Sequence, residues 1–280
     1  MGTVRYGTSS WSEKSWVGPF YPKGTAPGDY LNYYATQFTT VEADVTYYRV
    51  PDRRLVTGWD DKTPDGFVLS AKFPRSVVHC GQGPIPDGDK LLVSEHVAQD
   101  TNDFLEGMAY LGPKCGPLVL QFPYFNRRVF KGPREFADRL VPYLDALPKA
   151  FRYAVEIRNK FWLKPWLLDL LRERNIALVL LDLAYMPHPD ALTDLNLITT
   201  DFTFVRLIGD RKAVDKRTDT FDKIVLDQSG RISRWAKLLQ TFMSEVPVAY
   251  VYANNHYAGH GPATIRQLVD LLPAEMTSHD

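Results

Sequence analysis

Ionisable side chains stand at the ends of short apolar segments in this sequence of 280 residues. Glu42 and Glu156 belong to two such segments, and Asp182 ends a third. Two facing carboxylates can act as acid and base, or as acid and nucleophile. We therefore take Glu42 and Glu156 as the leading catalytic pair and Asp182 as a third candidate. Their separation is not encoded in the spacing, so the sequence does not distinguish retaining from inverting hydrolysis.

Positive and amide side chains occupy equivalent places in other segments. A guanidinium donates two parallel hydrogen bonds to a phosphate or carboxylate, so an anionic substrate group is expected. Three aromatic residues follow segment ends, where a ring can stack on a sugar or a base. The predicted substrate-binding residues are Trp11, Tyr47, Lys72, Gln121, Arg158, Trp162, Arg206, Asn254 and Asn255.

Two other interpretations of these residues stay open. Lys72 could pair with Glu42, and Arg158 or Arg206 with Glu156, as an ion network that only fixes the fold. His79 and His256 could join the carboxylates around a metal ion, but the spacing gives no ligand set, so no metal ligand is assigned. The cofactor therefore remains unknown at this stage.

Eight apolar segments must position these side chains. Most are rich in Val, Leu, Ile, Phe and Tyr and lack alternation, as strands buried on both faces do. They start about 35 residues apart and alternate with helical patterns, which predicts one (β/α)₈ TIM-type barrel over residues 1–280. The predicted strands are Val4–Thr8, Thr39–Val45, Phe67–Lys72, Pro117–Gln121, Tyr153–Glu156, Ala177–Asp182, Phe202–Arg206 and Val248–Ala253. The predicted helices are 27–38, 91–111, 133–144, 163–174, 232–242 and 262–272, and only a short helix fits 187–198.

Composition narrows the expected partners. The 33 basic and 33 acidic residues cancel, which argues against non-specific binding to nucleic acid or to an anionic membrane. No apolar run approaches the ~20 residues of a membrane span, and the first residues lack a signal region. Cys80 and Cys115 form no CxxC pair. We expect a cytoplasmic protein with a small-molecule partner and an unknown oligomeric state.

Several motifs, in order, resemble the YecE-like family, also called domain of unknown function 72. They are Gly7-Thr-Ser-Ser-Trp11, Val41-Glu-Ala-Asp-Val-Thr-Tyr-Tyr-Arg-Val-Pro51, Ser70-Ala-Lys-Phe-Pro74, Gln121-Phe-Pro123, Val155-Glu-Ile-Arg158, Val205-Arg-Leu-Ile-Gly209 and Tyr250-Val-Tyr-Ala-Asn-Asn255. The resemblance implies a TIM-type barrel without an agreed activity. This chain departs from the family at Asp44-Val45, where Asn-Ser is usual, at Asn159 and Ile208, where histidines are usual, and at Ala253, where Phe is usual.

Three functions are compatible with these residues. The first is an enzyme that hydrolyses or isomerises a sugar or sugar phosphate with its paired carboxylates. The second is a protein that binds a nucleotide or the end of a nucleic acid without catalysis. The third is a metal-assisted hydrolase.

Overall fold

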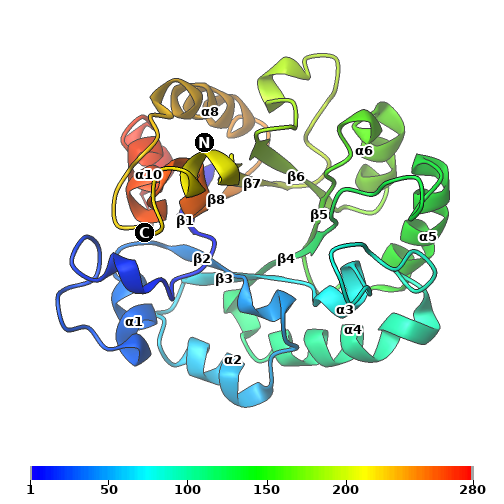
Figure 1. Ribbon diagram of the computed structural model, residues 1–280, viewed down its shortest axis with the longest axis horizontal. Helices are drawn as coiled ribbons and strands as arrows, with labels where there is room; N and C mark the ends of the chain where they lie inside the picture. Colours follow the sequence, from blue (N-terminus) through cyan, green and yellow to red (C-terminus); the bar gives the residue numbers. More distant parts are fainter. Residues whose placement is uncertain (1, 279–280) are drawn as a thin grey trace.

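The computed structural model describes residues 2–278, which form an eight-stranded parallel barrel surrounded by helices (Figure 1). Consecutive strands are neighbours around the barrel. The strands are β1 (Thr3–Thr8), β2 (Thr40–Ala43), β3 (Val68–Lys72), β4 (Cys115–Gln121), β5 (Tyr153–Glu156), β6 (Ala177–Leu183), β7 (Phe202–Gly209) and β8 (Val248–Ala253). This architecture confirms the predicted (β/α)₈ barrel, and all eight strands lie where the apolar segments indicate.

The helices lie on the outside of the barrel (Figure 1). The α-helices are α1 (Tyr30–Tyr34), α2 (Arg53–Asp60), α3 (Arg75–Val78), α4 (Ser94–Ala109), α5 (Pro133–Ala146), α6 (Pro165–Arg172), α7 (Arg211–Asp215), α8 (Ser229–Phe242), α9 (Asn255–Ala258), α10 (Gly261–Val269) and α11 (Ala274–Thr277). Short 3₁₀ helices are η1 (Lys14–Trp16), η2 (Pro27–Asp29), η3 (Val45–Tyr47), η4 (Gly112–Lys114), η5 (Lys160–Trp162) and η6 (Pro189–Ala191).

Helix α2 is absent from the sequence prediction. It buries only Val56 and Trp59, so its apolar stripe is too narrow to show a helical period. The missed signal is its cap, because Asp52 accepts a hydrogen bond of 2.8 Å from the Leu55 backbone N–H. The segment 187–198 contains only η6, as the sequence indicates.

Alternate strand residues fill the barrel. Val119, Ala154, Val179, Phe204 and Tyr252 belong to one buried apolar cluster inside it. Their strand neighbours, including Leu120, Val155, Leu180 and Val205, belong to the larger cluster that packs under the helices. Successive residues along a strand therefore point alternately into the barrel and toward the surrounding helices.

The barrel closes between β1 and β2 by a single parallel bridge, Ser9 to Glu42. The hydroxyl of Tyr34 on α1 supplements it, accepting from the Thr8 N–H at 2.7 Å and donating to the Thr40 carbonyl at 3.2 Å. Gly7 is required here, because a Cβ at this position would lie 1.9 Å from the Thr40 carbonyl oxygen. We call this contact between β1 and β2 the β1–β2 seam.

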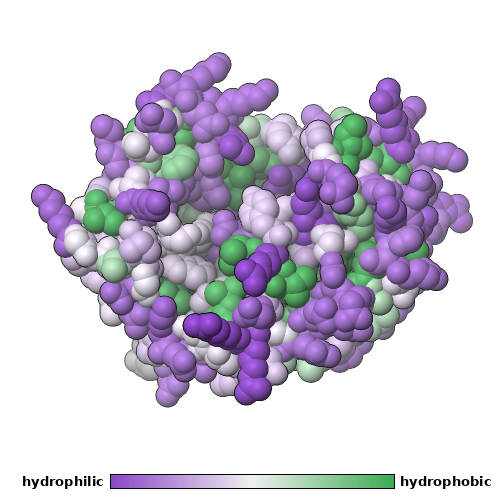
Figure 2. All heavy atoms as spheres, turned by 60° about the horizontal axis from the view of Figure 1, so that its bottom comes forward, coloured by the Kyte–Doolittle hydropathy of each residue, from purple (hydrophilic) through white to green (hydrophobic). Residues whose placement is uncertain are grey.

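Hydrophilic residues cover most of the surface visible in Figure 2, and hydrophobic residues form small separate patches. Within residues 2–278, no helix is long and apolar enough to cross a membrane.

Candidate functional site at the barrel mouth

Arg206 of β7 lies at the centre of a buried ion cluster at the carboxyl ends of the strands. Its Nη1 donates to Glu156 and, at 2.8 Å, to Oε1 of Gln121. Its Nη2 donates to Oε1 of Glu42 at 2.9 Å. Its Nε lies 2.7 Å from Oε2 of Glu42, without the alignment of a hydrogen bond. Three other strands thus supply the partners of one guanidinium.

Two further cations complete this mouth cluster, which consists of Glu42, Lys72, Gln121, Glu156, Arg158 and Arg206. Lys72 Nζ lies 3.2 Å from Glu42 Oε1, and Arg158 Nε lies 2.7 Å from Glu156 Oε1. The glutamate side chains are 0% exposed, whereas those of Lys72 and Arg158 are 11% and 22% exposed. The two cations therefore form the part of the cluster that a molecule at the mouth would meet. The structure brings together six of the residues that the sequence singles out.

Burial and the charges of neighbouring groups have opposing effects on the pKa values of Glu156 and Lys72. Burial raises the pKa of Glu156, but the charges of Arg206 and Arg158 and the hydrogen bonds from them outweigh it, so the pKa lies below its ordinary value. Burial lowers the pKa of Lys72, the charge of Glu42 opposes this, and the charge of Arg206 adds to it. The pKa of Lys72 therefore lies below its ordinary value. Glu156 is held as a carboxylate, and Lys72 releases its proton more readily than a surface lysine does.

Asp44 is a functional candidate that the sequence prediction leaves out of the site. It is half-buried, and its carboxylate accepts a hydrogen bond from the Ser10 side chain. Burial raises the pKa of Asp44, the charge of Lys72 lowers it, and the charge of Glu42 raises it, with a net upward shift. Ser10 has a φ of 103°, a conformation that costs a non-glycine residue of the order of 1–3 kcal/mol. The available signal was that Asp44 lies two residues after Glu42, directly beyond the end of β2 at Ala43.

Tyr47 lies beside the same positive groups. Burial raises its pKa, while the charges of Arg75 and Arg158 and a hydrogen bond with Arg75 lower it. Tyr47 therefore lies near Arg75 and Arg158, and its contact with a substrate stays a prediction.

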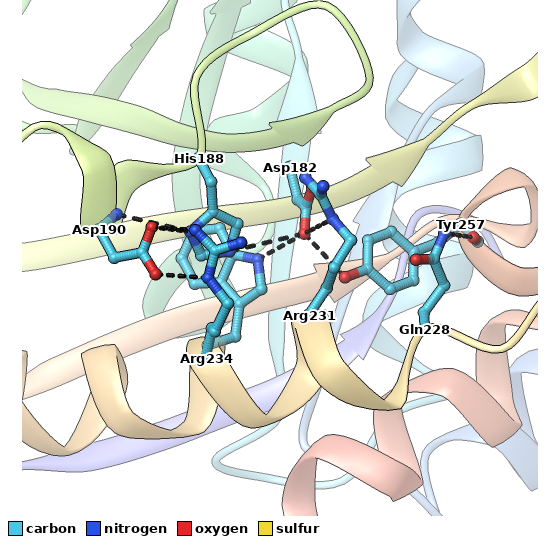
Figure 3. Close-up of polar contacts among 8 residues, drawn as sticks. Asp182, His188, Asp190, Gln228, Arg231, Arg234 and Tyr257 are labelled. Atoms are coloured by element: carbon cyan, nitrogen blue, oxygen red, sulfur yellow. Dashed lines mark hydrogen bonds and ion pairs between the residues drawn. The ribbon is translucent and has the colours of Figure 1, made fainter.

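Asp182 does not reach the mouth cluster. In the pairing of β6 with β7, Leu181 lies opposite Arg206 and Asp182 lies opposite Leu207. Leu181 and Arg206 therefore point into the barrel, and Asp182 points toward the helices outside it. In Figure 3 its carboxylate meets Arg231 of α8 and Tyr257 of α9. Arg231 donates to both oxygens of Asp182, and Trp235 and Tyr257 each donate to Oδ2 at 2.7 Å. The placement of Asp182 at the mouth was wrong, because the uninterrupted apolar segment before it conceals which residues face inward.

Asn254 and Asn255 have structural partners at the end of β8. Asn254 Oδ1 accepts from the His256 backbone N–H at 3.0 Å and caps α9. Asn255 Oδ1 accepts from Trp16 Nε1 at 3.2 Å and from the Gly261 N–H at 2.8 Å. These contacts occupy the side-chain oxygens, whereas a phosphate would accept from the amide N–H groups, so the predicted substrate-binding role of Asn254 and Asn255 stays a prediction.

Trp11 and Trp162 lie on different parts of the rim. Trp11 packs edge to face with Trp59 at 5.6 Å between ring centroids and lines a pocket of about 370 Å³ next to α2. Trp162 stacks on Phe125 at 6.0 Å and lines a separate groove that Arg158 also lines. The predicted aromatic residues therefore do not form one pocket.

The other reactive residues do not join the mouth cluster. Within residues 2–278, no group of three or more His, Cys, Asp and Glu side chains is placed to hold a metal ion. Burial raises the pKa of the Cys80 thiol to about 11, which disfavours the reactive thiolate at neutral pH.

Comparison with known proteins assigns the family. A family model described as protein of unknown function DUF72 matches residues 5–279. The UPF0759 protein YecE of Escherichia coli is 32% identical over 225 residues, which is 74% of each chain. The UPF0759 protein YunF of Bacillus subtilis is 20% identical over 295 residues, or 97% of this chain and 95% of YunF.

Solved structures share the fold. A DUF72 family protein from Thermotoga maritima aligns with a TM-score of 0.72 at 24% identity, covering 96% of this chain and 98% of that one. D-psicose 3-epimerase from Clostridium cellulolyticum aligns with a TM-score of 0.56 at 10% identity, covering 97% of this chain and 93% of the epimerase. The strand order, the motifs and the family match agree, and the chain belongs to the DUF72 family of proteins of unknown function.

Proposed function

We propose that this protein is an enzyme that isomerises a small anionic, hydroxyl-rich substrate, such as a sugar phosphate, at the barrel mouth. The observation that carries the proposal is the pair Lys72 and Asp44. The Lys72 side chain is 11% exposed with its Nζ 3.2 Å from Glu42 Oε1, and Asp44 is half-buried and acted on by the charges of both. The pKa of Lys72 is lowered and that of Asp44 is raised. Groups with displaced pKa values at the active end of a barrel are candidates for proton transfer.

Isomerisation is favoured over glycoside hydrolysis by the state of the carboxylates. Hydrolysis needs one protonated carboxyl to donate to the leaving group. Glu156 is held ionised by Arg206 and Arg158, and Glu42 contacts both Arg206 and Lys72. We therefore propose an electrostatic role for the two glutamates in place of the predicted acid and base pair. They keep Arg206 and the neighbouring cations in place.

Isomerisation requires a base that removes a proton next to a carbonyl and an acid that returns one. Lys72, once neutral, accepts a proton, and Asp44, once protonated, donates one. Arg158 offers guanidinium N–H groups to an anionic group, since it is 22% exposed and only its Nε is engaged by Glu156.

Proton exchange with solvent tests this chemistry whatever product is formed. The protein is incubated in D₂O with a panel of aldose and ketose phosphates, and deuterium at the carbon next to the carbonyl is followed by NMR. We expect incorporation into at least one substrate. Lys72→Met and Asp44→Asn should each slow it by about 10²- to 10⁴-fold, as loss of a general acid or base does.

Matched controls separate catalysis from stability. Lys237→Met, on the exposed face of α8, and Asp201→Asn, in an exposed pair with Arg152, should leave the exchange rate unchanged. Release of a free sugar or of phosphate without deuterium incorporation would contradict isomerisation and favour hydrolysis.

A further inference from the structure

A second groove, of about 410 Å³, lies beside the mouth and is formed by the segments that follow β4, β5 and β6. Tyr124, Arg127, Lys131, Arg158, Lys160 and Phe161 line it, and we call it the rim groove. Its volume lies within the range of about 300–1,000 Å³ that is usual for small-ligand sites. Of the residues that line it, the sequence prediction singles out Arg158 and Trp162.

The charged side chains that line the rim groove are all positive. Four basic side chains line it, and no acidic residue does. Among the described residues, the side chains of Arg127, Lys131 and Lys160 form no ion pair, whereas Arg158 pairs with Glu156. Glu135, which is close by, accepts from the Lys131 backbone N–H at 2.5 Å. In a chain with no net charge, this local excess favours an anionic ligand.

Aromatic rings are exposed in the same groove. Phe161 is 78% exposed, Tyr124 60% and Tyr185 52%. The Lys160 ammonium lies 5.0 Å from the centre of the Phe161 ring. Exposed rings rimmed by cations are the usual means of binding a planar base together with its phosphate, because the ring stacks and the cations neutralise charge.

We propose that the rim groove binds a nucleoside monophosphate, with the base against Phe161 or Tyr124 and the phosphate among Arg127, Lys131 and Lys160. Arg158 lines the groove and contacts Glu156, so it connects this site to the mouth cluster. A single nucleotide matches the groove's volume and the local extent of its positive charge. The proposal does not depend on proton transfer at the mouth, because neither Lys72 nor Asp44 lines the groove.

Calorimetric titration of the full chain with AMP and UMP tests the proposal. We expect one saturable site per chain for both nucleotides, and roughly tenfold weaker binding for adenosine, ribose 5-phosphate and inorganic phosphate. Phe161→Ala and Arg127→Gln should each weaken AMP binding by about five- to a hundredfold, the range measured when stacking rings or phosphate contacts are removed. Lys72→Met should leave AMP binding unchanged, which separates this site from the proposed isomerase.

Arg128→Gln, at an exposed neighbour of Arg127 outside the groove, and Tyr110→Ala, at an exposed ring on the end of α4, should not change the affinity for AMP. Absence of saturable binding, or equal binding of inorganic phosphate and AMP, would overturn the proposal. Tighter binding of single-stranded dT₁₀ than of UMP at the same salt concentration would overturn it in favour of a nucleic-acid strand.

Discussion

His260 couples the stability of the protein to pH. It caps α10, its Nδ1 accepting from the Ala263 backbone N–H at 3.2 Å, and its buried Nε2 has no partner among the described residues. Burial and the charge of Arg266 lower its pKa to about 4. Between pH 6.5 and 4 the unfolded chain therefore binds a proton at this residue that the folded chain does not, and stability falls as pH falls through this range.

His260→Asn should remove this contribution while keeping a helix cap, since asparagine is also favoured at this position. Urea unfolding at pH 7 and pH 4 should show that the variant loses about 3 kcal/mol less than the parent protein over that interval. His96→Asn, on the exposed face of α4, should behave as the parent protein. Identical pH dependence in the His260 variant would contradict the assignment.

At the scale of single residues, the sequence predicted which residue types stand at strand ends. Its alternative of an ion network also named the pairs that the structure shows, Lys72 with Glu42 and both Arg158 and Arg206 with Glu156. Glu42, Glu156 and Arg206 were identified from their places at the ends of apolar segments, yet their common ion cluster follows from three-dimensional closure. Asp182 was misplaced because an apolar run buried on both faces carries no alternation from which its facing could be determined.

At the scale of elements, Asp182 joins β6 to α8. Arg231 and Trp235 come from α8, and both donate to its carboxylate (Figure 3 shows Arg231). Asp182→Asn leaves the buried Trp235 indole and the partly exposed Arg231 without a full set of acceptors, and we expect a loss of about 2–4 kcal/mol in the free energy of unfolding. Catalysis per folded molecule should not change, because this side chain faces away from the mouth.

Urea unfolding combined with the deuterium-exchange assay measures both quantities for Asp182. Asp169→Asn removes an exposed ion pair with Arg172 on α6 and should cost at most about 1 kcal/mol. A catalytic loss without a stability loss in Asp182→Asn would return this residue to the candidate catalytic set.

The β1–β2 seam depends on the hydroxyl of Tyr34. Tyr34→Phe leaves the buried Thr8 N–H and Thr40 carbonyl without this partner, so we expect it to destabilise the protein by about 1–3 kcal/mol. Tyr33→Phe, at the half-buried preceding residue, should change stability by less than about 0.5 kcal/mol in the same urea titration. Equal effects of the two substitutions would show that the seam hydrogen bonds contribute nothing.

Element order was almost fully predictable, because eight apolar segments alternating with helical patterns leave few alternatives to a barrel. Helix α2 was missed, since its two buried residues do not show a helical period, and the short helices α3, α7, α9 and α11 were missed as well. How the barrel closes was not predictable, because the β1–β2 seam uses one bridge and a side chain from α1 in place of a strand ladder. That residues 1–280 form one folding unit stays a prediction.

At the scale of the whole molecule, the barrel consists of two four-stranded halves with weak joints between them. One half contains β6, β7, β8 and β1, and the other contains β2 to β5. Strand β7 pairs with β8 along Phe202 to Leu207, but β5 pairs with β6 only at Ala154 and Val155, and the β1–β2 seam has a single bridge. Arg206 lies in the first half, and its partners Glu42, Gln121 and Glu156 lie in the second. The hydrogen bonds and ion pairs of the mouth cluster therefore connect the two halves.

Arg206→Met should open these joints before it unfolds the rest of the barrel. It leaves two buried glutamates without their shared cation, which should destabilise the protein by about 3–5 kcal/mol. Hydrogen–deuterium exchange by mass spectrometry should show the largest acceleration in peptides covering β2 and β5, with a smaller change in β7 and β8, because local opening requires less free energy than global unfolding. Arg152→Met removes an exposed pair with Asp201 and should leave the exchange pattern unchanged. Uniform acceleration across all eight strands would contradict the two-half description, since it would mean that the barrel opens only as a whole.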